Sequence, residues 1–182
     1  RYGFHGLSYA SLVARLPDLS GQALPRRLLA AHLGNGASLC AIVDGVSVAT
    51  TMGYSPLDGL TMGSRAGAID GNAVLRLAEV HGVAGAGDIL NRRSGLVALG
   101  GSNDMRVLHK TAPFAVEHFA YWAARHAGSM VAAMGGLDAI AFTGGIGEND
   151  HVMRGMILER LGFLGVAYDV PANRHHARAL HD

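Results

Sequence analysis

The sequence predicts an α/β domain in which helices flank a mixed sheet, laid out along the chain as βββαβα. Three features predict it. Residues 28–50 contain three apolar runs, separated by Asn35-Gly36 and Asp44-Gly45, pairs that favour tight hairpin turns. A long helical pattern over residues 112–134 follows. A fourth apolar run over residues 138–142 then leads into another helical pattern, so we expect a fourth strand.

Composition bounds the class of protein. The chain has 182 residues, 49% hydrophobic and 16% charged, with 26 glycines, which is typical of one globular, loop-rich domain. A formal net charge of +1 and scattered arginines offer no basic surface for nucleic acid. No apolar run could cross a bilayer and no signal peptide is visible, so we expect no membrane partner. A single cysteine excludes an internal disulfide, and we expect a cytoplasmic protein. The single cysteine, Cys40, lies in an apolar run and should be a buried thiol.

The first element is a short helix that Ser8 is expected to cap and Pro17 to end. His5 lies just before it, and either packing in a turn or donation into a cleft is possible there. Residues 51–68 show neither strand nor helix period, so we expect a long loop, and long loops in compact domains are usually functional. Arg65 is the only cation of that loop, and it could bind phosphate in a bidentate fork or remain solvated.

The second half is predicted to be mostly helical. We expect a helix over 72–81, a flexible connector over 82–87, a helical turn that ends near residue 91, and an interruption of the helical pattern at 94–95. An N-cap cluster at 102–104 should precede a helix over 105–110. The long core helix over 112–134, a helix over 152–161 and a last strand over 165–169 should follow. His118 and His126 lack companions at metal-ligand spacing and are interpreted as surface or satisfied residues. The tail at His175 and His176 is expected to fray.

Two glycine turns follow strand ends. The first, residues 34–36, is built from Gly and Asn, which accept positive φ cheaply and can turn main-chain N–H groups toward an anion. An ordinary hairpin would look the same. The second, residues 143–149, joins a strand to a helix N-terminus, which is an anion-binding arrangement. Together the turns predict a nucleotide held between two phosphate-facing loops.

Five separated segments resemble the acetate kinase family, in the family's order and over nearly the whole chain. They are residues 1–6, 31–36, 52–59 with 62–65, 102–106 and 142–149. The resemblance implies the actin-like, RNase H-type ATPase domain of the sugar kinase and heat-shock chaperone superfamily, with residues 1–182 as a nucleotide-binding kinase domain. It also implies transfer of the γ-phosphoryl group of ATP to acetate, giving acetyl phosphate and ADP, by a magnesium-dependent cytoplasmic homodimer.

The same resemblance implies roles for single residues. His5 and Arg65 would be catalytic and would donate to equatorial oxygens of the transferring phosphoryl group. Phe4 and Pro56 would line the apolar pocket for the methyl group of acetate. The nucleotide-binding residues would be His32, Leu33, Gly34, Asn35 and Gly36 at the phosphates, Gly145, Ile146, Gly147, Glu148 and Asn149 in the second turn, and Asp104, Met105 and Arg106 at the adenosine.

The chain departs from the family in sequence and in extent. Where the family usually has a histidine after Gly-Thr-Ser, this chain reads Leu7-Ser8-Tyr9, which removes an imidazole near the site. The family's magnesium-binding asparagine, substrate-carboxylate arginine and catalytic aspartate would precede the chain, and a magnesium-binding glutamate would follow it. We therefore expect no metal ligand within it. Since it opens on Arg1, we expect a fragment or processed product whose partner domain and extreme C-terminus lie elsewhere.

Three functions remain open: an acetate kinase, an acyl kinase for propionate or butyrate, and a non-catalytic nucleotide-binding module of the actin or chaperone type. The loop that carries Arg65 favours a kinase, because a binding module needs no arginine at the acceptor. Butyrate kinases match the five segments less well. Acetate and propionate differ by one methylene, worth only about 1–3 kcal/mol in an apolar pocket, and the sequence does not separate them.

Overall fold

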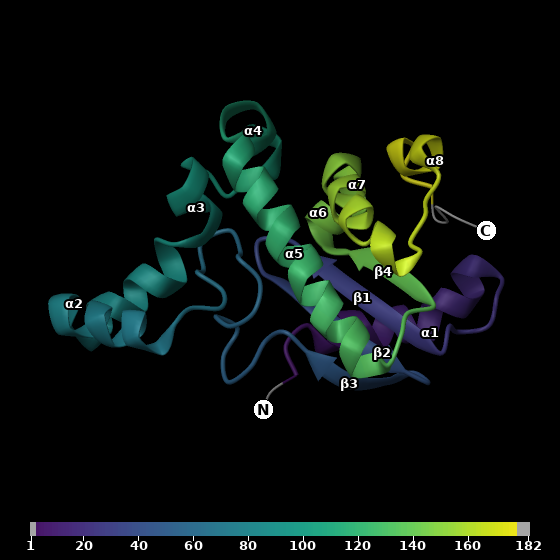
Figure 1. The fold of residues 1–182 in the computed structure, drawn as a ribbon, viewed down its shortest axis with the longest axis horizontal. Coiled ribbons are helices and arrows are strands. Elements are labelled where there is room, and N and C mark those ends of the chain that lie inside the picture. The colour runs from purple at the N-terminus through teal and green to yellow at the C-terminus, as the bar shows by residue number, and fades with distance from the viewer. Residues whose placement is uncertain (1–2, 178–182) are drawn as a thin grey trace.

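The structure, a computed structural model, describes residues 3–177 and contains a four-stranded sheet with helices on both faces (Figure 1). Strands β1 (Arg27–Leu33), β2 (Ala37–Val43) and β3 (Val46–Thr50) form an antiparallel meander. Strand β4 (Ala139–Thr143) pairs in parallel with β1, so the strand order is β3-β2-β1-β4. This mixed sheet confirms the predicted α/β class. Arg1 and Tyr2, which open the first of the five segments, lie outside the described residues.

The two hairpin turns of the meander differ from each other. Asp44 and Gly45 both have positive φ, 49° and 78°, as a tight two-residue turn requires. The turn at residues 34–36 has no positive φ, so that part of the prediction is wrong; it closes through the Gly34 N–H, which donates to the Gly36 carbonyl over 3.1 Å. Glycine is needed in the first turn for space, because a Cβ on Gly36 would lie 3.4 Å from the His5 side chain.

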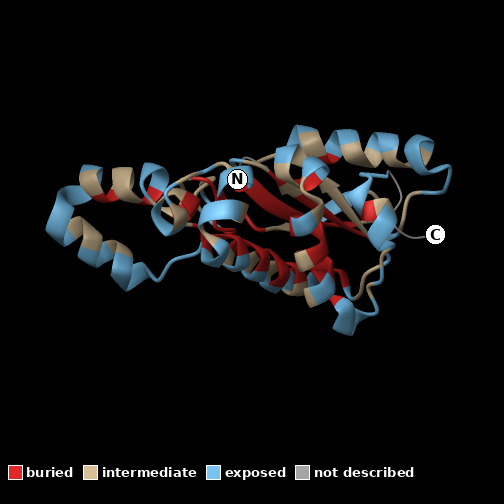
Figure 2. Ribbon diagram, turned by 90° about the horizontal axis from the view of Figure 1, so that it is seen from above, coloured by how far each residue is buried: buried red, intermediate tan, exposed pale blue. Residues whose placement is uncertain are grey.

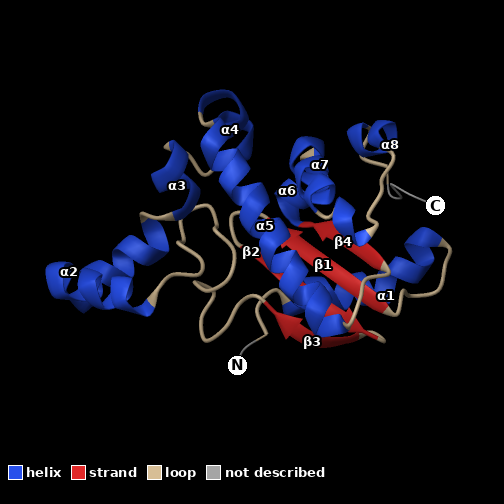
Figure 3. Cartoon of the chain, viewed as in Figure 1, coloured by secondary structure: helices blue, strands red, loops and turns tan. Residues whose placement is uncertain are grey.

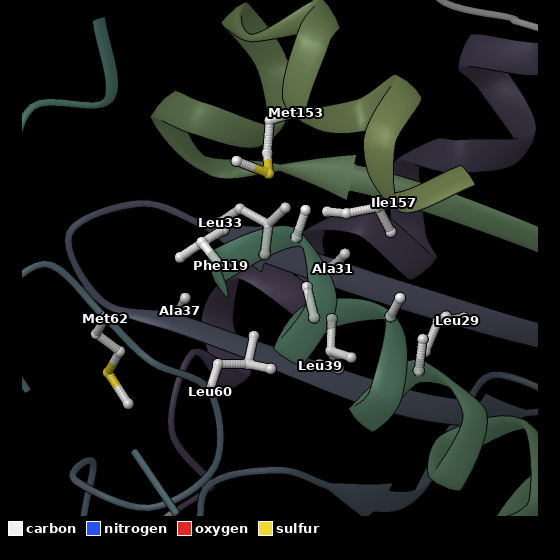
Figure 4. Close-up of a cluster of buried hydrophobic side chains, with 14 of the residues drawn as sticks. Leu29, Ala31, Leu33, Ala37, Leu39, Leu60, Met62, Phe119, Met153 and Ile157 are labelled. Atoms are coloured by element: carbon white, nitrogen blue, oxygen red, sulfur yellow. The ribbon is translucent and has the colours of Figure 1, made fainter. Parts of the chain in front are cut away.

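Alternation along β1 divides the core between the two faces of the sheet. Leu29, Ala31 and Leu33 face the long helix α5 (Pro113–Met134), where Phe119 is 2% exposed (Figure 4). Helix α7 (His151–Arg160) completes this layer, and the buried residues concentrate in the sheet and on the inner side of α5 (Figure 2). The prediction of a long core helix over 112–134 is confirmed, and its aromatic and methionine residues pack in the core.

Helix α1 (Gly6–Ser20) covers the other face, where Tyr9 packs with Leu28, Ala30, Cys40 and Ile42. Cys40 is 1% exposed, and burial raises the pKa of its thiol, as expected for a structural cysteine.

The predicted bounds of α1 are wrong at both ends. The N-cap is His5, and Ser8 lies inside the helix with its hydroxyl 3.0 Å from Nδ1 of His32. Pro17 also lies inside the helix, whose C-cap is Gly21 in the left-handed conformation.

Helix α2 (Gly71–Arg92) projects away from the sheet (Figure 3). Its backbone leaves helical geometry only at Gly82 (φ 70°, ψ 164°), where the helix is kinked. The flexible connector expected over 82–87 is therefore wrong, because the other residues of that range are helical.

Helix α3 (Gly95–Gly100) was not predicted. Its first amides donate to the long loop, from Leu96 N to Met62 O and from Val97 N to Gly63 O, both over 2.9 Å. Helix α4 (Met105–Thr111) follows the predicted N-cap cluster, and the Asp104 side chain accepts the Arg106 N–H.

The C-terminal part corrects two further expectations. Residues 144–149 form a short helix, α6 (Gly144–Asn149), instead of a loop. Residues 166–169 are not a strand: after a 3-10 turn (Gly162–Leu164), the Tyr168 hydroxyl donates to Glu159 on α7 over 3.1 Å, and Asp169 caps α8 (Val170–Arg174). His176, expected to fray, lies 3.2 Å from the Arg154 guanidinium through Nδ1.

Among the described residues, no helix combines the length and the apolar character needed to cross a bilayer.

Candidate active site

The two predicted glycine turns lie side by side. Strands β1 and β4 pair in parallel up to His32 and Thr143, so both chains leave the sheet at the same edge. Gly144 has φ 80°, and a Cβ there would lie 2.6 Å from the Leu33 carbonyl oxygen. A Cβ on Gly34 would lie 3.9 Å from the Gly145 nitrogen. Main-chain groups of both turns therefore border one region at the carboxyl ends of two parallel strands, where open α/β sheets bind ligands.

His5 and Arg65 meet next to the first turn. A Cβ built on Gly36 would lie 3.4 Å from Nε2 of His5 and 3.5 Å from Nη1 of Arg65. His5 is brought there by its left-handed conformation (φ 56°) at the start of α1. The structure thus brings together His5, for which the sequence left packing in a turn open, and Arg65, for which it left a solvated role open. Gly36 is glycine because a side chain would fill the space between them.

The His5 imidazole is held from two sides. Its Nδ1 lies 2.8 Å from the Ser38 hydroxyl, and its ring stacks on His32 with centroids 4.0 Å apart and planes inclined by 25°. Burial, then the neighbouring His32 and Arg65, lower the pKa of His5 to about 4. His5 is therefore neutral at pH 7, with one ring nitrogen carrying a proton. Burial also lowers the pKa of His32, and nearby Glu148 opposes that shift.

Arg65 reaches the site from a loop that is fixed along its main chain. Its carbonyl accepts the Met62 N–H over 3.2 Å, and a Cβ on Gly67 (φ 78°) would lie 2.5 Å from the Leu60 carbonyl oxygen. Within residues 3–177, the partners of its guanidinium are the Pro56 carbonyl at 3.4 Å and the Met62 sulfur at 3.8 Å, neither of which is charged. A cation held in place without a carboxylate can bind an anion.

The first turn is also tied to the loop before α4. The Gly63 N–H donates to the Asn35 carbonyl over 3.0 Å, and the Asn103 side-chain amide donates to Asn35 Oδ1 over 3.3 Å. A Cβ on Gly63 would overlap Asn35 Oδ1, so glycine allows this close approach. Three segments distant in sequence thus share one hydrogen-bonded network beside the site.

The predicted nucleotide-binding residues differ in how accessible their side chains are. Leu33 is fully buried and Met105 is 4% exposed, so both side chains belong to the core and could meet a ligand only through the main chain. Asp104 and Arg106 pair with each other, Nη2 to Oδ2 at 2.7 Å, which lowers the pKa of Asp104, and 90% of the Arg106 side chain is exposed. Glu148 Oε1 accepts the Thr143 hydroxyl proton over 3.3 Å.

The two predicted acyl-pocket residues differ in their surroundings. Phe4 is partly buried against the main core, and the Pro56 carbonyl accepts a hydrogen bond from Arg65. The structure thus ties Pro56 to the candidate catalytic arginine.

Sequence reasoning missed a buried arginine behind the second turn. Arg154 is 4% exposed and donates to the Gly147 carbonyl at 2.9 Å, the Glu148 carbonyl at 2.8 Å, and both the side chain and the main-chain carbonyl of Asn173 at 2.8 Å. It thereby fixes α6 to the segment around α8. In the sequence, Arg154 lies on the apolar side of the helical pattern over 152–161. Its structural role becomes evident only from its burial in the structure.

The described residues contain no group of three or more His, Cys, Asp or Glu side chains placed to hold a metal ion.

Comparison with known proteins gives consistent results. Residues 1–180 match the model of the acetokinase family. The chain is 49% identical over 181 residues to the acetate kinase of Rhodopseudomonas palustris strain TIE-1, covering 95% of this chain and 46% of that protein. It is 46% identical over 187 residues to the acetate kinase of Nitrobacter hamburgensis, covering 99% of this chain and 46% of that protein. The chain thus spans about half the length of the curated relatives it matches.

Solved structures show the same likeness. A Porphyromonas gingivalis acetate kinase superposes with a TM-score of 0.88 at 33% identity, over 100% of this chain and 48% of that one. A propionate kinase from Francisella tularensis superposes with a TM-score of 0.88 at 37% identity, over 96% of this chain and 48% of that one.

Proposed function

Because this chain belongs to the acetokinase family, we propose that it is the nucleotide-binding portion of a kinase that transfers the γ-phosphoryl group of ATP to acetate. Its fold is the actin-like ATPase fold that the sequence resemblance implied, as the likeness to the acetate and propionate kinase structures shows. The products would be acetyl phosphate and ADP, and the reaction would be reversible.

The convergence of His5 and Arg65 beside Gly36 carries this proposal. In phosphoryl transfer the protein does little covalent work, and positioned donors and cations around the transferring group supply most of the catalysis. Arg65 would give a fixed positive charge at the equatorial oxygens. His5, neutral because its pKa is about 4, would donate one hydrogen bond through Nε2 without adding charge. A module that only bound nucleotide would not need this pair.

The nucleotide would lie along the two glycine turns. Main-chain groups of residues 32–36 would take phosphates from one side and those of residues 145–149 from the other, as their adjacency allows. Asp104, Met105 and Arg106 would face the adenosine. In this arrangement Arg154 supports the second turn from behind, since it donates to the Gly147 and Glu148 carbonyls.

We also propose, from the family resemblance, that the whole protein uses Mg²⁺, forms a homodimer and works in the cytoplasm. The metal would neutralise charge on the phosphates when bound. The family resemblance places the residues that would hold the metal outside this chain, and we assign it no step here.

Propionate is the second candidate acceptor. The close superposition with the Francisella tularensis propionate kinase supports it. Phe4 and Pro56 would set the room for the acyl chain. Acetate leads because the acetate kinases of Rhodopseudomonas palustris and Nitrobacter hamburgensis are 46–49% identical to this chain.

The decisive experiment is a hydroxamate assay for acyl phosphate on the natural full-length polypeptide, with ATP and either acetate or propionate. We expect acetate to give the higher kcat/KM. A reversed ratio would identify a propionate kinase. Binding of ATP without acyl phosphate from either acid would reject the kinase and favour a nucleotide-binding module.

A further inference from the structure

Two buried hydroxyl groups lie directly behind His5. The Ser38 hydroxyl is 2.8 Å from Nδ1 of His5, and the Tyr9 hydroxyl is 2.5 Å from the Ser38 hydroxyl and 2.9 Å from the Ser38 carbonyl oxygen. Ser38 is fully buried and Tyr9 is 6% exposed. The three side chains come from the start of α1, its first turns and β2, so the fold assembles this chain of contacts across the sheet face.

Counting protons leaves two complete arrangements. Each hydroxyl carries one proton, neutral His5 carries one, and the Ser38 carbonyl can only accept. In the first, His5 Nδ1–H donates to Ser38 Oγ, Ser38 donates to Tyr9, and Tyr9 donates to the Ser38 carbonyl. His5 Nε2 then has a lone pair toward Gly36. In the second, Tyr9 donates to Ser38 Oγ, Ser38 donates to His5 Nδ1, and Nε2 carries the proton.

The group that binds at Nε2 selects between these arrangements. Nε2 faces the space beside Gly36 that Arg65 also borders. Without a ligand, the Arg65 guanidinium favours a lone pair there. A phosphoryl oxygen can only accept, so it requires a proton on Nε2. Both arrangements hold the same number of protons, so the change needs no added charge in a buried place, where a charge would be costly.

We propose that Tyr9 and Ser38 are positioning residues for His5, which fix its ring and present Nε2–H to the transferring phosphoryl group. The proposal rests on the proposed function of His5. Ser38 supplies the direct partner of Nδ1. Tyr9 orients the Ser38 hydroxyl, because its own hydroxyl contacts both oxygens of Ser38.

Tyr9 is suited to this task. Burial raises the pKa of its hydroxyl, so the proton that it must donate is retained throughout the neutral range. Its ring packs among the apolar residues under α1, including Leu28 and Ile42, so the hydroxyl is held by side-chain packing as well. The family motif usually has a histidine where this chain has Tyr9, which suggested only a missing imidazole. In the structure the Tyr9 hydroxyl contacts the Ser38 hydroxyl, which in turn contacts His5.

The first test measures the His5 tautomer directly. In the 182-residue chain labelled with ¹⁵N, two-bond ¹H–¹⁵N correlations distinguish protonated from unprotonated ring nitrogens. We expect one dominant His5 tautomer in the wild type and averaged ring shifts in Ser38→Ala and Tyr9→Phe. Tyr168→Phe, which removes a hydroxyl hydrogen-bonded to Glu159, should leave the His5 shifts unchanged. Identical His5 shifts in the wild type, Ser38→Ala and Tyr9→Phe would overturn the proposal.

The second test is kinetic and uses the natural full-length polypeptide. Tyr9→Phe keeps the ring that packs in the core, so its far-UV spectrum and Tm should stay close to the wild type. Its kcat should fall roughly tenfold, with KM for ATP within about twofold, because the loss affects an interaction strongest in the transition state. A rise in KM with unchanged kcat would contradict a positioning role. Absence of acetyl phosphate from the wild type would reject the proposed function, whereas the tautomer measurement would still decide the roles of Tyr9 and Ser38.

Discussion

His32 and Thr143 are partners across the parallel strands β1 and β4, at the last residue pair of that register. The first glycine turn begins two residues after His32 and the second begins at Thr143 itself, so their relative position is set by main-chain hydrogen bonds of the sheet and not by loop side chains. A sheet register is rigid on the scale of ligand contacts, and this rigidity suits a site that must hold phosphates without reorganisation.

Gly36→Ala should lower activity without unfolding the domain. The added methyl would lie 3.4 Å from His5 Nε2 and 3.5 Å from Arg65 Nη1, so it would occupy the place proposed for a phosphoryl oxygen. Gly36 does not have positive φ, and alanine can adopt its conformation. We expect kcat/KM for ATP in the full-length polypeptide to fall at least tenfold, with a Tm within a few degrees of the wild type.

Gly128→Ala is the matched control for that substitution. Gly128 lies in α5, and its added methyl meets no atom within 4 Å, so stability should rise by up to about 1 kcal/mol and activity should stay unchanged. Equal activity of Gly36→Ala and Gly128→Ala would show that the phosphoryl group does not bind beside Gly36.

Arg65→Ala and Arg65→Lys should lower kcat far more than they raise KM for ATP. The arginine would stabilise charge that develops in the transition state, and a lysine cannot reproduce its planar fork. By analogy with other phosphoryl-transfer arginines, we expect a loss on the order of 10³-fold in kcat. Steady-state kinetics on the full-length polypeptide measure both parameters, and a near wild-type kcat for Arg65→Ala would remove Arg65 from the catalytic residues.

The 182-residue chain alone should bind ATP weakly and form no acetyl phosphate. The glycine turns, His5 and Arg65 are present, so an affinity in the high-micromolar to millimolar range, roughly 4–6 kcal/mol, is expected. Catalysis also needs an acceptor held in line and a metal on the phosphates, and the family resemblance places both tasks outside this chain. Isothermal titration beside a hydroxamate assay separates binding from turnover. Acetyl phosphate from the purified chain would show that the catalytic residues are misplaced here.

The ion pair between Arg27 and Asp138 should give stability that depends on pH. Arg27 donates to both carboxylate oxygens and to the Gly135 carbonyl, and the hydrogen bond from Arg27 lowers the pKa of Asp138. A carboxyl whose folded pKa lies below its unfolded value stabilises the fold at pH values above the unfolded pKa and loses that contribution as pH falls through the folded pKa.

Urea unfolding of the wild type and Asp138→Asn from pH 7 to pH 3 tests this dependence. The difference in unfolding free energy should be constant above about pH 5 and should shrink below about pH 4. Asp18→Asn, an exposed carboxyl on α1 without an ion pair to any of residues 3–177, serves as the control and should give a small difference throughout. A constant difference for Asp138→Asn down to pH 3 would contradict the pairing.

Arg154→Leu should destabilise the domain strongly. Loss of the guanidinium would leave carbonyls of Gly147, Glu148 and Asn173 without their donor in a buried place. Several such acceptors make a loss of about 3 kcal/mol in unfolding free energy reasonable. Arg92→Leu, at an arginine whose side chain is 82% exposed, should change it by less than about 1 kcal/mol. Equal effects in a urea titration would contradict the structural role of Arg154.

Local patterns predicted the parts of the fold that local forces determine. The meander over 28–50 followed from alternating apolar runs and turn pairs, and α5 followed from apolar spacing over six turns, because periodicity reports which face is buried. The glycine turns were found because few other residues permit such close main-chain approach. Their adjacency required the parallel pairing of β1 with β4, which the sequence only suggested.

Distant contacts account for what the sequence did not predict. Helix α3 forms because its amides find carbonyls of the long loop, and no pattern within its six residues signals this. The apolar run over 165–169 has the composition of a strand, but Tyr168 and Asp169 are used to bind α7 and cap α8. Ser38 and Tyr9 gain their importance from partners 29 or more residues away, and Arg154 binds Asn173, 19 residues away, so single-sequence patterns give them no distinguishing mark.

Cys40 can serve as a native probe for opening of the sheet, because its thiol reacts with labelling reagents only when it becomes exposed. It is the single thiol of the chain, lies 1% exposed in the central strand β2, and burial keeps it protonated. A thiolate, not a thiol, attacks labelling reagents, so the folded domain should resist them. The rate at which a reagent reacts with the native protein therefore reports how often the strand separates from α1, with no introduced residue and at the face of the sheet where Tyr9 and Ser38 meet.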